Sequence, residues 1–166
     1  SALIDMNRLL LPNLDKLIKS IDLKMKQVKG SVKTGRTHLM DAMPIDFSQE
    51  LSGWKAQLEA NKKTIIQAAN RMNELPQGGT AIGTGINAHK DFSKHFCSEL
   101  NKLSKFKTKP AKNFYQGLSS VDNAVELSSA LKNLSLILMK ISNDLRWMNS
   151  GPLTGLGEIE LQALQP

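Results

Sequence analysis

The chain has 166 residues, a formal net charge of +7 and 40% hydrophobic residues. This length and apolar content predict a folded domain with a core and exclude a disordered composition, and no stretch approaches the roughly 20 apolar residues that cross a bilayer. The single cysteine, Cys97, excludes an internal disulfide and fits a reducing compartment. Because no secretory signal is visible, we predict a cytoplasmic location, or the mitochondrial matrix if the source is eukaryotic.

The positive charge is densest between residues 102 and 112, where lysines surround Phe106 and Pro110. An excess of basic residues can bind nucleic acid, an anionic membrane or small anionic substrates. A nucleic-acid surface needs more arginine and more aromatic rings for stacking, whereas aromatic residues make up 5% of this chain. We interpret the lysines as a solvated helix end and linker, and expect no nucleic-acid or membrane partner.

The first predicted helix runs from about Ala2 to Val28, because apolar residues recur there at steps of three and four. These residues are Leu3, Met6, Leu10, Leu14, Leu17, Ile21, Met25 and Val28. Pro12 lies within the pattern, and a proline there either bends the helix or begins its main part.

Gly30 and Gly35 interrupt the helical pattern, and a loop is predicted to about Phe47. Its residues 35–44 bring together a cation, a hydroxyl, a base and an acid, namely Arg36, Thr37, His38 and Asp41. Such a segment can hold a small dianion, and an imidazole with a pKa near neutrality can then move a proton. A lone loop histidine is more often structural than catalytic, so the residues alone leave both roles open.

The second predicted helix begins near Asp46 and ends before Pro76. Gln49 follows Asp46 by three residues, which is the spacing of a capping box. Apolar residues alternate at steps of three and four, as in a heptad pattern: Leu51, Trp54, Leu58, Ile65, Ala68, Met72 and Leu75. Asn61 is the polar member of this seam, and it either pairs with a facing helix or lies at the edge.

The glycine-rich stretch over residues 77–88 matches G-x-G-x-x-A by letter at residues 83–88. That motif requires a preceding strand in a βαβ unit, but here a helix precedes it, and a P-loop would require a lysine after the glycine. Two interpretations remain. Its backbone amides and the hydroxyls of Thr80 and Thr84 can bind an anion at the start of the next helix, or its glycines let two elements approach closely.

A third helix is predicted over about His89–Leu103 and a fourth over about Leu118–Asn149, followed by an irregular tail to Pro166; no strand is expected. The fourth helix would be about 45 Å long, longer than a domain of this mass needs. We therefore predict an all-α fold, an elongated bundle of long antiparallel helices in a single domain over residues 1–166. The helix lengths favour a homo-oligomer, and the alternative is a monomeric bundle whose seams all face inward.

Metal binding is not expected from the histidine pattern. His38, His89 and His95 are scattered, and none pairs with another histidine or a cysteine at ligand spacing. His95 and Cys97 are two residues apart, and on a helix their side chains diverge.

Four blocks resemble class II fumarases, members of the fumarase/aspartase superfamily, and they occur in the family's order. The blocks are residues 35–39 (GRTHL), 78–87 (GGTAIGTGIN), 138–147 (LMKISNDLRW) and 150–159 (SGPLTGLGEI). Within the superfamily, aspartases carry glutamine in place of His38. Met40 and Leu153 depart from the family pattern, which has glutamine and arginine there.

The resemblance implies reversible hydration of fumarate to L-malate in the tricarboxylic acid cycle, without a metal or an organic cofactor. It implies a homotetramer whose active sites each combine three subunits. Thr37 then binds a substrate carboxylate, and His38 takes part in acid/base chemistry through an active-site water. Asn87 is a further candidate for substrate binding.

Two family blocks are missing from the chain: an SSND block expected before Ser1 and a GSSxMPxKxN loop expected after Pro166. The chain is therefore expected to be the central helical domain of a larger lyase and to be inactive alone. The alternatives are another superfamily lyase, such as aspartase, and a non-catalytic helical oligomerisation module.

Overall fold

The computed structural model describes residues 2–104 and 106–163. These residues form two compact units, one comprising residues up to 62 together with those from 132 onward, the other residues 63–131. Two long helices, α3 (Phe47–Arg71) and α6 (Asp122–Met148), contribute to both units. The single domain predicted over residues 1–166 stays a prediction.

The first unit is built on helices that each bury one apolar face. Besides parts of α3 and α6 it contains α1 (Ala2–Asp5), the π-helical turn η1 (Met6–Leu10), α2 (Leu11–Gln27) and the strands β1 (Val32–Thr37) and β2 (Met40–Asp46). Pro12 is the second residue of α2, directly after the π-helical turn η1, and it lacks the N–H that would continue the helical hydrogen bonds. The predicted start of the main helix at this proline is thereby confirmed.

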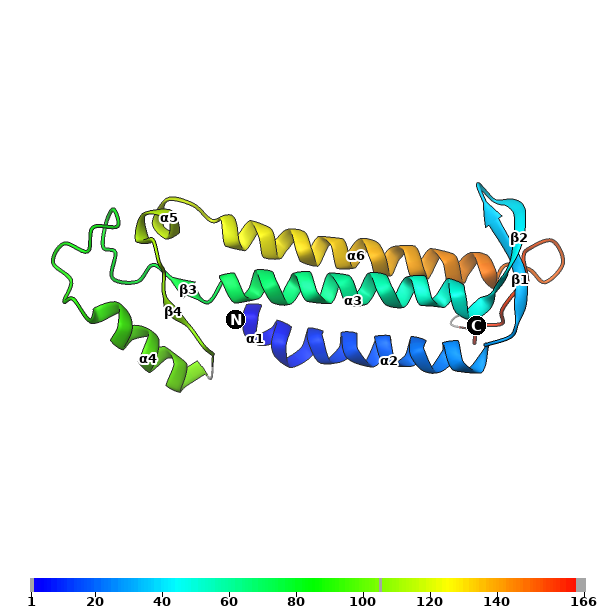
Figure 1. Ribbon diagram of the computed structural model, residues 1–166, viewed down its shortest axis with the longest axis horizontal. Coiled ribbons are helices and arrows are strands. Elements are labelled where there is room, and N and C mark those ends of the chain that lie inside the picture. Colours follow the sequence, from blue (N-terminus) through cyan, green and yellow to red (C-terminus); the bar gives the residue numbers. More distant parts are fainter. Residues whose placement is uncertain (1, 105, 164–166) are drawn as a thin grey trace. The chain divides into compact units, whose positions relative to one another are not determined.

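In this unit α3 runs antiparallel to both α2 and α6 and lies beside them (Figure 1). Lys55 on α3 pairs with Asp22 on α2, and the indole N–H of Trp54 donates to Asp144 on α6 at 3.0 Å. The buried core of the unit contains members of the two apolar seams given above, Met6, Leu14, Ile21, Leu51, Trp54 and Leu58, together with Leu134, Ile141 and Met148 of α6. Asn61 is also buried, so it does not lie at the edge of the seam.

The second unit contains the ends of α3 and α6, the helices α4 (Phe92–Ser104) and α5 (Phe114–Ser119), and a small parallel sheet of β3 (Glu74–Leu75) and β4 (Lys109–Pro110). Its buried hydrophobic residues are Ile65, Ala68, Ala69, Cys97, Leu127 and Ala130. Across the two long helices, Arg71 pairs with Glu126.

The predicted all-α class is confirmed, but the expectation of no strand is wrong. The predicted loop before Phe47 is the antiparallel hairpin β1–β2, whose residues are mostly exposed and therefore show no alternation of apolar and polar residues. The second helix ends at Arg71 rather than Leu75 because Glu74–Leu75 pair with β4. The fourth helix begins at Asp122 rather than Leu118, because Ser120 is extended and separates it from α5.

The capping box predicted at the start of α3 is confirmed. The backbone N–H of Asp46 donates to Gln49 Oε1 at 2.9 Å, and the Asp46 carboxylate accepts the N–H groups of Ser48 at 2.8 Å and Gly30 at 2.6 Å. The hydroxyl of Ser48, then its N–H and that of Gly30, lower the pKa of Asp46 below its usual value. Asp46 thus joins the end of the hairpin to the first turn of α3 and to the chain before β1.

We expect Asp46→Ala to lower the free energy of unfolding, because three hydrogen-bond donors lose their acceptor. Since folding depresses the pKa of Asp46, its contribution is present above the unfolded value of about 3.9 and is lost as the pH falls through the folded value. Urea unfolding at pH 7 and near pH 2 should show a difference between wild type and variant that shrinks in acid. Asp5→Ala, which changes an exposed aspartate, is the control, and an equal effect of both variants at pH 7 would contradict the prediction.

Candidate functional site

Thr37 and His38 lie at the turn of the β1–β2 hairpin. The turn consists of His38 and Leu39, whose φ angles of 52° and 63° are both positive, as a type I′ turn between antiparallel strands requires. Thr37 pairs with Met40 at the base of the turn. All four residues are exposed in this chain, so the hydroxyl and the imidazole are open to a ligand or to a neighbouring molecule.

The hairpin is bent one residue before Arg36. The register passes from Thr34–Pro44 to Arg36–Asp41, so Gly35 faces two residues of β2 in a β-bulge, which bends and twists a strand. Gly35 is buried, and a Cβ there would lie 2.5 Å from the carbonyl oxygen of Met43. The close approach of the two backbones therefore requires glycine at this position.

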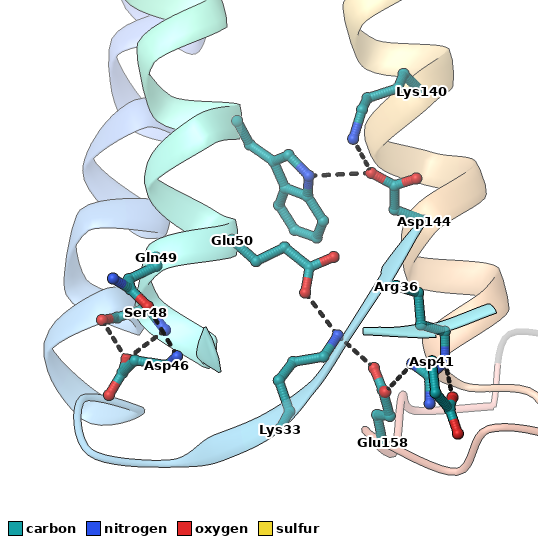
Figure 2. Close-up of polar contacts among 11 residues, drawn as sticks. Lys33, Arg36, Asp41, Asp46, Ser48, Gln49, Glu50, Lys140, Asp144 and Glu158 are labelled. Atoms are coloured by element: carbon teal, nitrogen blue, oxygen red, sulfur yellow. Dashed lines mark hydrogen bonds and ion pairs between the residues drawn. The ribbon is translucent and has the colours of Figure 1, made fainter. Parts of the chain in front are cut away.

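A cluster of ion pairs joins the hairpin to α3 and to the segment that follows α6 (Figure 2). Lys33 Nζ lies 2.6 Å from a carboxylate oxygen of Glu50, on α3, and 2.6 Å from one of Glu158, which follows α6. Arg36 pairs with the other oxygen of Glu158. The backbone N–H of Glu158 donates to the carbonyl oxygen of Met148 at 2.8 Å, so Glu158 is itself fixed to the end of α6.

The cluster stays charged because its members compensate one another. Burial by itself would lower the pKa of Lys33, but hydrogen bonds to Glu158 and Glu50 outweigh it and raise the pKa above the usual lysine value. Burial would likewise raise the pKa of Glu158, but hydrogen bonds from Arg36 and Lys33 outweigh it and lower the pKa. Asp41, the acid that the sequence placed near His38, is exposed and lies 3.7 Å from Arg36 Nε.

A cavity of about 370 Å³ lies beside the cluster in the same unit. Its lining includes Lys33 and Arg36 from the hairpin, Glu50 and Glu158, and Trp147 from the end of α6. Thr37 and His38 are not part of the lining. Both cations of the cavity are paired with carboxylates, so the predicted dianion site is better sought at the exposed turn than in this cavity.

Asn87 lies in the other unit, at the end of the glycine-rich loop, exposed and with a φ angle of 65°. The structure brings Thr37 and His38 together on one turn but does not bring Asn87 into the same unit. Within the loop, a Cβ on Gly79 would lie 2.9 Å from Phe114, and a Cβ on Gly83 would lie 2.7 Å from the ring of Tyr115. These glycines thus let the loop pack closely on α5, which favours the second of the two interpretations of the stretch.

The described part of the chain holds no group of three or more His, Cys, Asp or Glu residues placed to bind a metal ion. Nor does any helix in residues 2–104 or 106–163 have the length and apolar character needed to span a membrane.

Sequence reasoning missed Lys33, Glu50 and Glu158 as parts of the site. Lys33 and Glu50 are ordinary charged residues in the sequence. They come together because the hairpin pairs Lys33 with Ile45, close to the start of α3. Glu158 lies in the SGPLTGLGEI block, so a signal existed, but the sequence alone gives no residue of that block a role in the site.

Residues 2–166 match the model of a protein family described as lyase, and the chain belongs to this family. Class II fumarate hydratases are among its similar proteins: one from Pseudomonas aeruginosa is 51% identical over 166 residues, covering 100% of this chain and 36% of that protein. One from Helicobacter pylori is 42% identical, covering 99% and 36%. The sequence-based resemblance to class II fumarases is thereby confirmed.

Solved structures agree in fold. A class II fumarase from Schistosoma mansoni superposes with a TM-score of 0.90 at 34% identity, covering 98% of this chain and 38% of that one. A fumarate lyase:delta crystallin from Brucella melitensis, bound to cobalt, gives a TM-score of 0.92 at 35% identity, covering 99% and 36%. The chain thus spans a little over one third of the length of the proteins it matches.

Proposed function

We propose that this chain is the central helical part of a class II fumarate hydratase, which interconverts fumarate and L-malate in the tricarboxylic acid cycle. The observation that carries the proposal is the 51% identity along the whole chain to a protein named for this activity. The histidine at position 38, where aspartases have glutamine, favours water rather than ammonia as the group added to fumarate.

In the proposed reaction, the Thr37 hydroxyl donates a hydrogen bond to a carboxylate of the substrate, and Asn87 is a second candidate for substrate binding. A base removes a proton from C3 of L-malate, and the adjacent carboxylate stabilises the carbanion. Hydroxide then leaves C2 with a proton from an acid. His38 serves this acid/base chemistry through a water molecule. No metal or organic cofactor takes part, and the expected location is the cytoplasm or the mitochondrial matrix.

The remaining groups of the site come from segments outside these residues and from other copies in a homotetramer. The exposure of Thr37 and His38 supports this arrangement, because a site finished by other segments needs an open turn. Apolar side chains at the same end of the hairpin, Leu39, Met40 and Met43, are 69–78% exposed. Exposed apolar clusters of this kind are typical of surfaces that another protein segment covers.

The test compares the 166-residue polypeptide with the protein encoded by the whole gene, following the loss of fumarate absorbance. We expect hydration by the gene-encoded protein and none by the polypeptide alone, because the latter lacks the remaining groups of the site. Robust turnover by the polypeptide that disappears in His38→Ala would contradict this expectation. Consumption of fumarate that depends on ammonia would identify an aspartase instead. A gene-encoded protein that assembles but consumes fumarate neither with water nor with ammonia would identify a helical oligomerisation module.

A further inference from the structure

The ion cluster connects β1, α3 and the segment after α6, close to the turn that carries Thr37 and His38. Arg36 directly precedes Thr37, and its guanidinium pairs with Glu158. Lys33 pairs with the same Glu158 and with Glu50. Glu158 is therefore the one carboxylate in this cluster that binds both cations of β1, and Figure 2 shows it between the Lys33 and Arg36 side chains.

We infer that Glu158 is a positioning residue: by holding Lys33 and Arg36 it fixes the direction in which the β1–β2 turn presents Thr37 and His38. As a statement about catalysis this rests on the proposed function, but as a statement about the hairpin it stands on the contacts alone. No direct contact of Glu158 with the substrate is part of the inference.

The hairpin needs such an anchor because little else determines its direction. A two-stranded hairpin is marginally stable by itself, and most residues of β2 are exposed. At its base the hairpin is held by Asp46 and by the hydrogen bond from Phe47 N–H to the carbonyl oxygen of Ser31, 2.8 Å long. Beyond the base, β1 bends at Gly35. Lys33 and Arg36, the two residues that pair with Glu158, lie on either side of that bend.

The cluster also differs from an ordinary surface ion pair. The side chains of Lys33 and Glu158 are each 13% exposed, whereas exposed pairs contribute little because solvent and salt screen them. Removing one member of a shielded cluster leaves its partner without compensation. Neutralising Glu158 would leave Lys33 paired with Glu50 alone and Arg36 paired with the exposed Asp41 alone, whereas neutralising Glu50 would leave both cations paired with Glu158.

The test uses the gene-encoded protein and Glu158→Gln, which keeps the shape of the side chain and removes its charge. We expect kcat for fumarate hydration to fall about 10- to 100-fold, since a displacement of catalytic groups by 1 Å can cost this much. Glu158→Asp, which keeps the charge, should recover part of the loss, and Glu50→Gln should have a smaller effect than Glu158→Gln. Glu160→Gln, two residues along and exposed, is the matched control and should keep wild-type activity.

Hydrogen exchange measured by mass spectrometry tests the positioning without reference to catalysis. We expect Glu158→Gln to speed exchange over residues 32–46 and to leave the long helices unchanged, because α3 and α6 pack through their own apolar seam. Should Glu158→Gln fail to fold, Arg36→Gln provides the same measurement from the other side of the pair. Unchanged exchange in the hairpin, or faster exchange spread evenly over α3 and α6, would overturn the inference. If the wild-type protein does not hydrate fumarate, the proposed function fails, and the exchange result still decides the inference about Glu158.

Discussion

Replacing His38 in the gene-encoded protein is expected to lower kcat/KM for fumarate hydration by about 10²- to 10⁴-fold, the usual contribution of a positioned acid/base group. The fold should survive, because the His38 side chain is exposed and its removal opens no cavity. The φ angle of 52° at this position makes His38→Asn the best variant, since asparagine tolerates the left-handed region better than alanine does. A loss of activity in His38→Asn thus reports on chemistry rather than on the turn.

The absorbance assay for fumarate measures this effect directly. His89→Asn changes an exposed histidine in the other unit and serves as the control, with activity close to wild type. If His38→Asn kept kcat/KM within about threefold of wild type, well short of an acid/base contribution, then the imidazole would have no part in proton transfer. In that case the resemblance of the GRTHL block would describe the scaffold only.

The second large effect is expected in the core. Leu58 has no exposed surface, and Leu58→Ala should lower the free energy of unfolding by about 2–5 kcal/mol, because it loses buried apolar area and leaves a cavity among packed helices. Leu23→Ala removes the same atoms from a side chain that is 50% exposed and should cost far less. Urea unfolding followed by far-UV circular dichroism measures both variants. A loss below about 1 kcal/mol for Leu58→Ala would show that the helices repack around the site.

The helices were predictable because each repeats one physical signal many times. The seam through Leu51, Leu58 and Ile65 is buried as the steps of three and four require, and the polar start of α3 at Asp46 and Gln49 forms the expected hydrogen bonds. Such signals are local, so neighbouring residues along the chain contain all the information needed to recognise them.

The hairpin was missed because its stability does not lie in its own residues. Its strands are mostly exposed, and Gly35 and Pro44 are typical of loops, so neither periodicity nor composition indicates a strand. Besides the contacts at its base, the hairpin is held by the pairing of Arg36 with Glu158, more than a hundred residues away along the chain. A partner at that distance cannot be identified from spacing, whereas Thr37 and His38 could be selected because a family block names them.

A structure of the gene-encoded protein with bound fumarate or L-malate shows which residues contact the substrate. We expect a carboxylate of the ligand within about 3.2 Å of Thr37 Oγ1, with the His38 ring facing the ligand directly or through one water, in a pocket completed by residues from outside this chain. A dicarboxylate bound elsewhere, with the His38 turn facing solvent in the assembled protein, would contradict it.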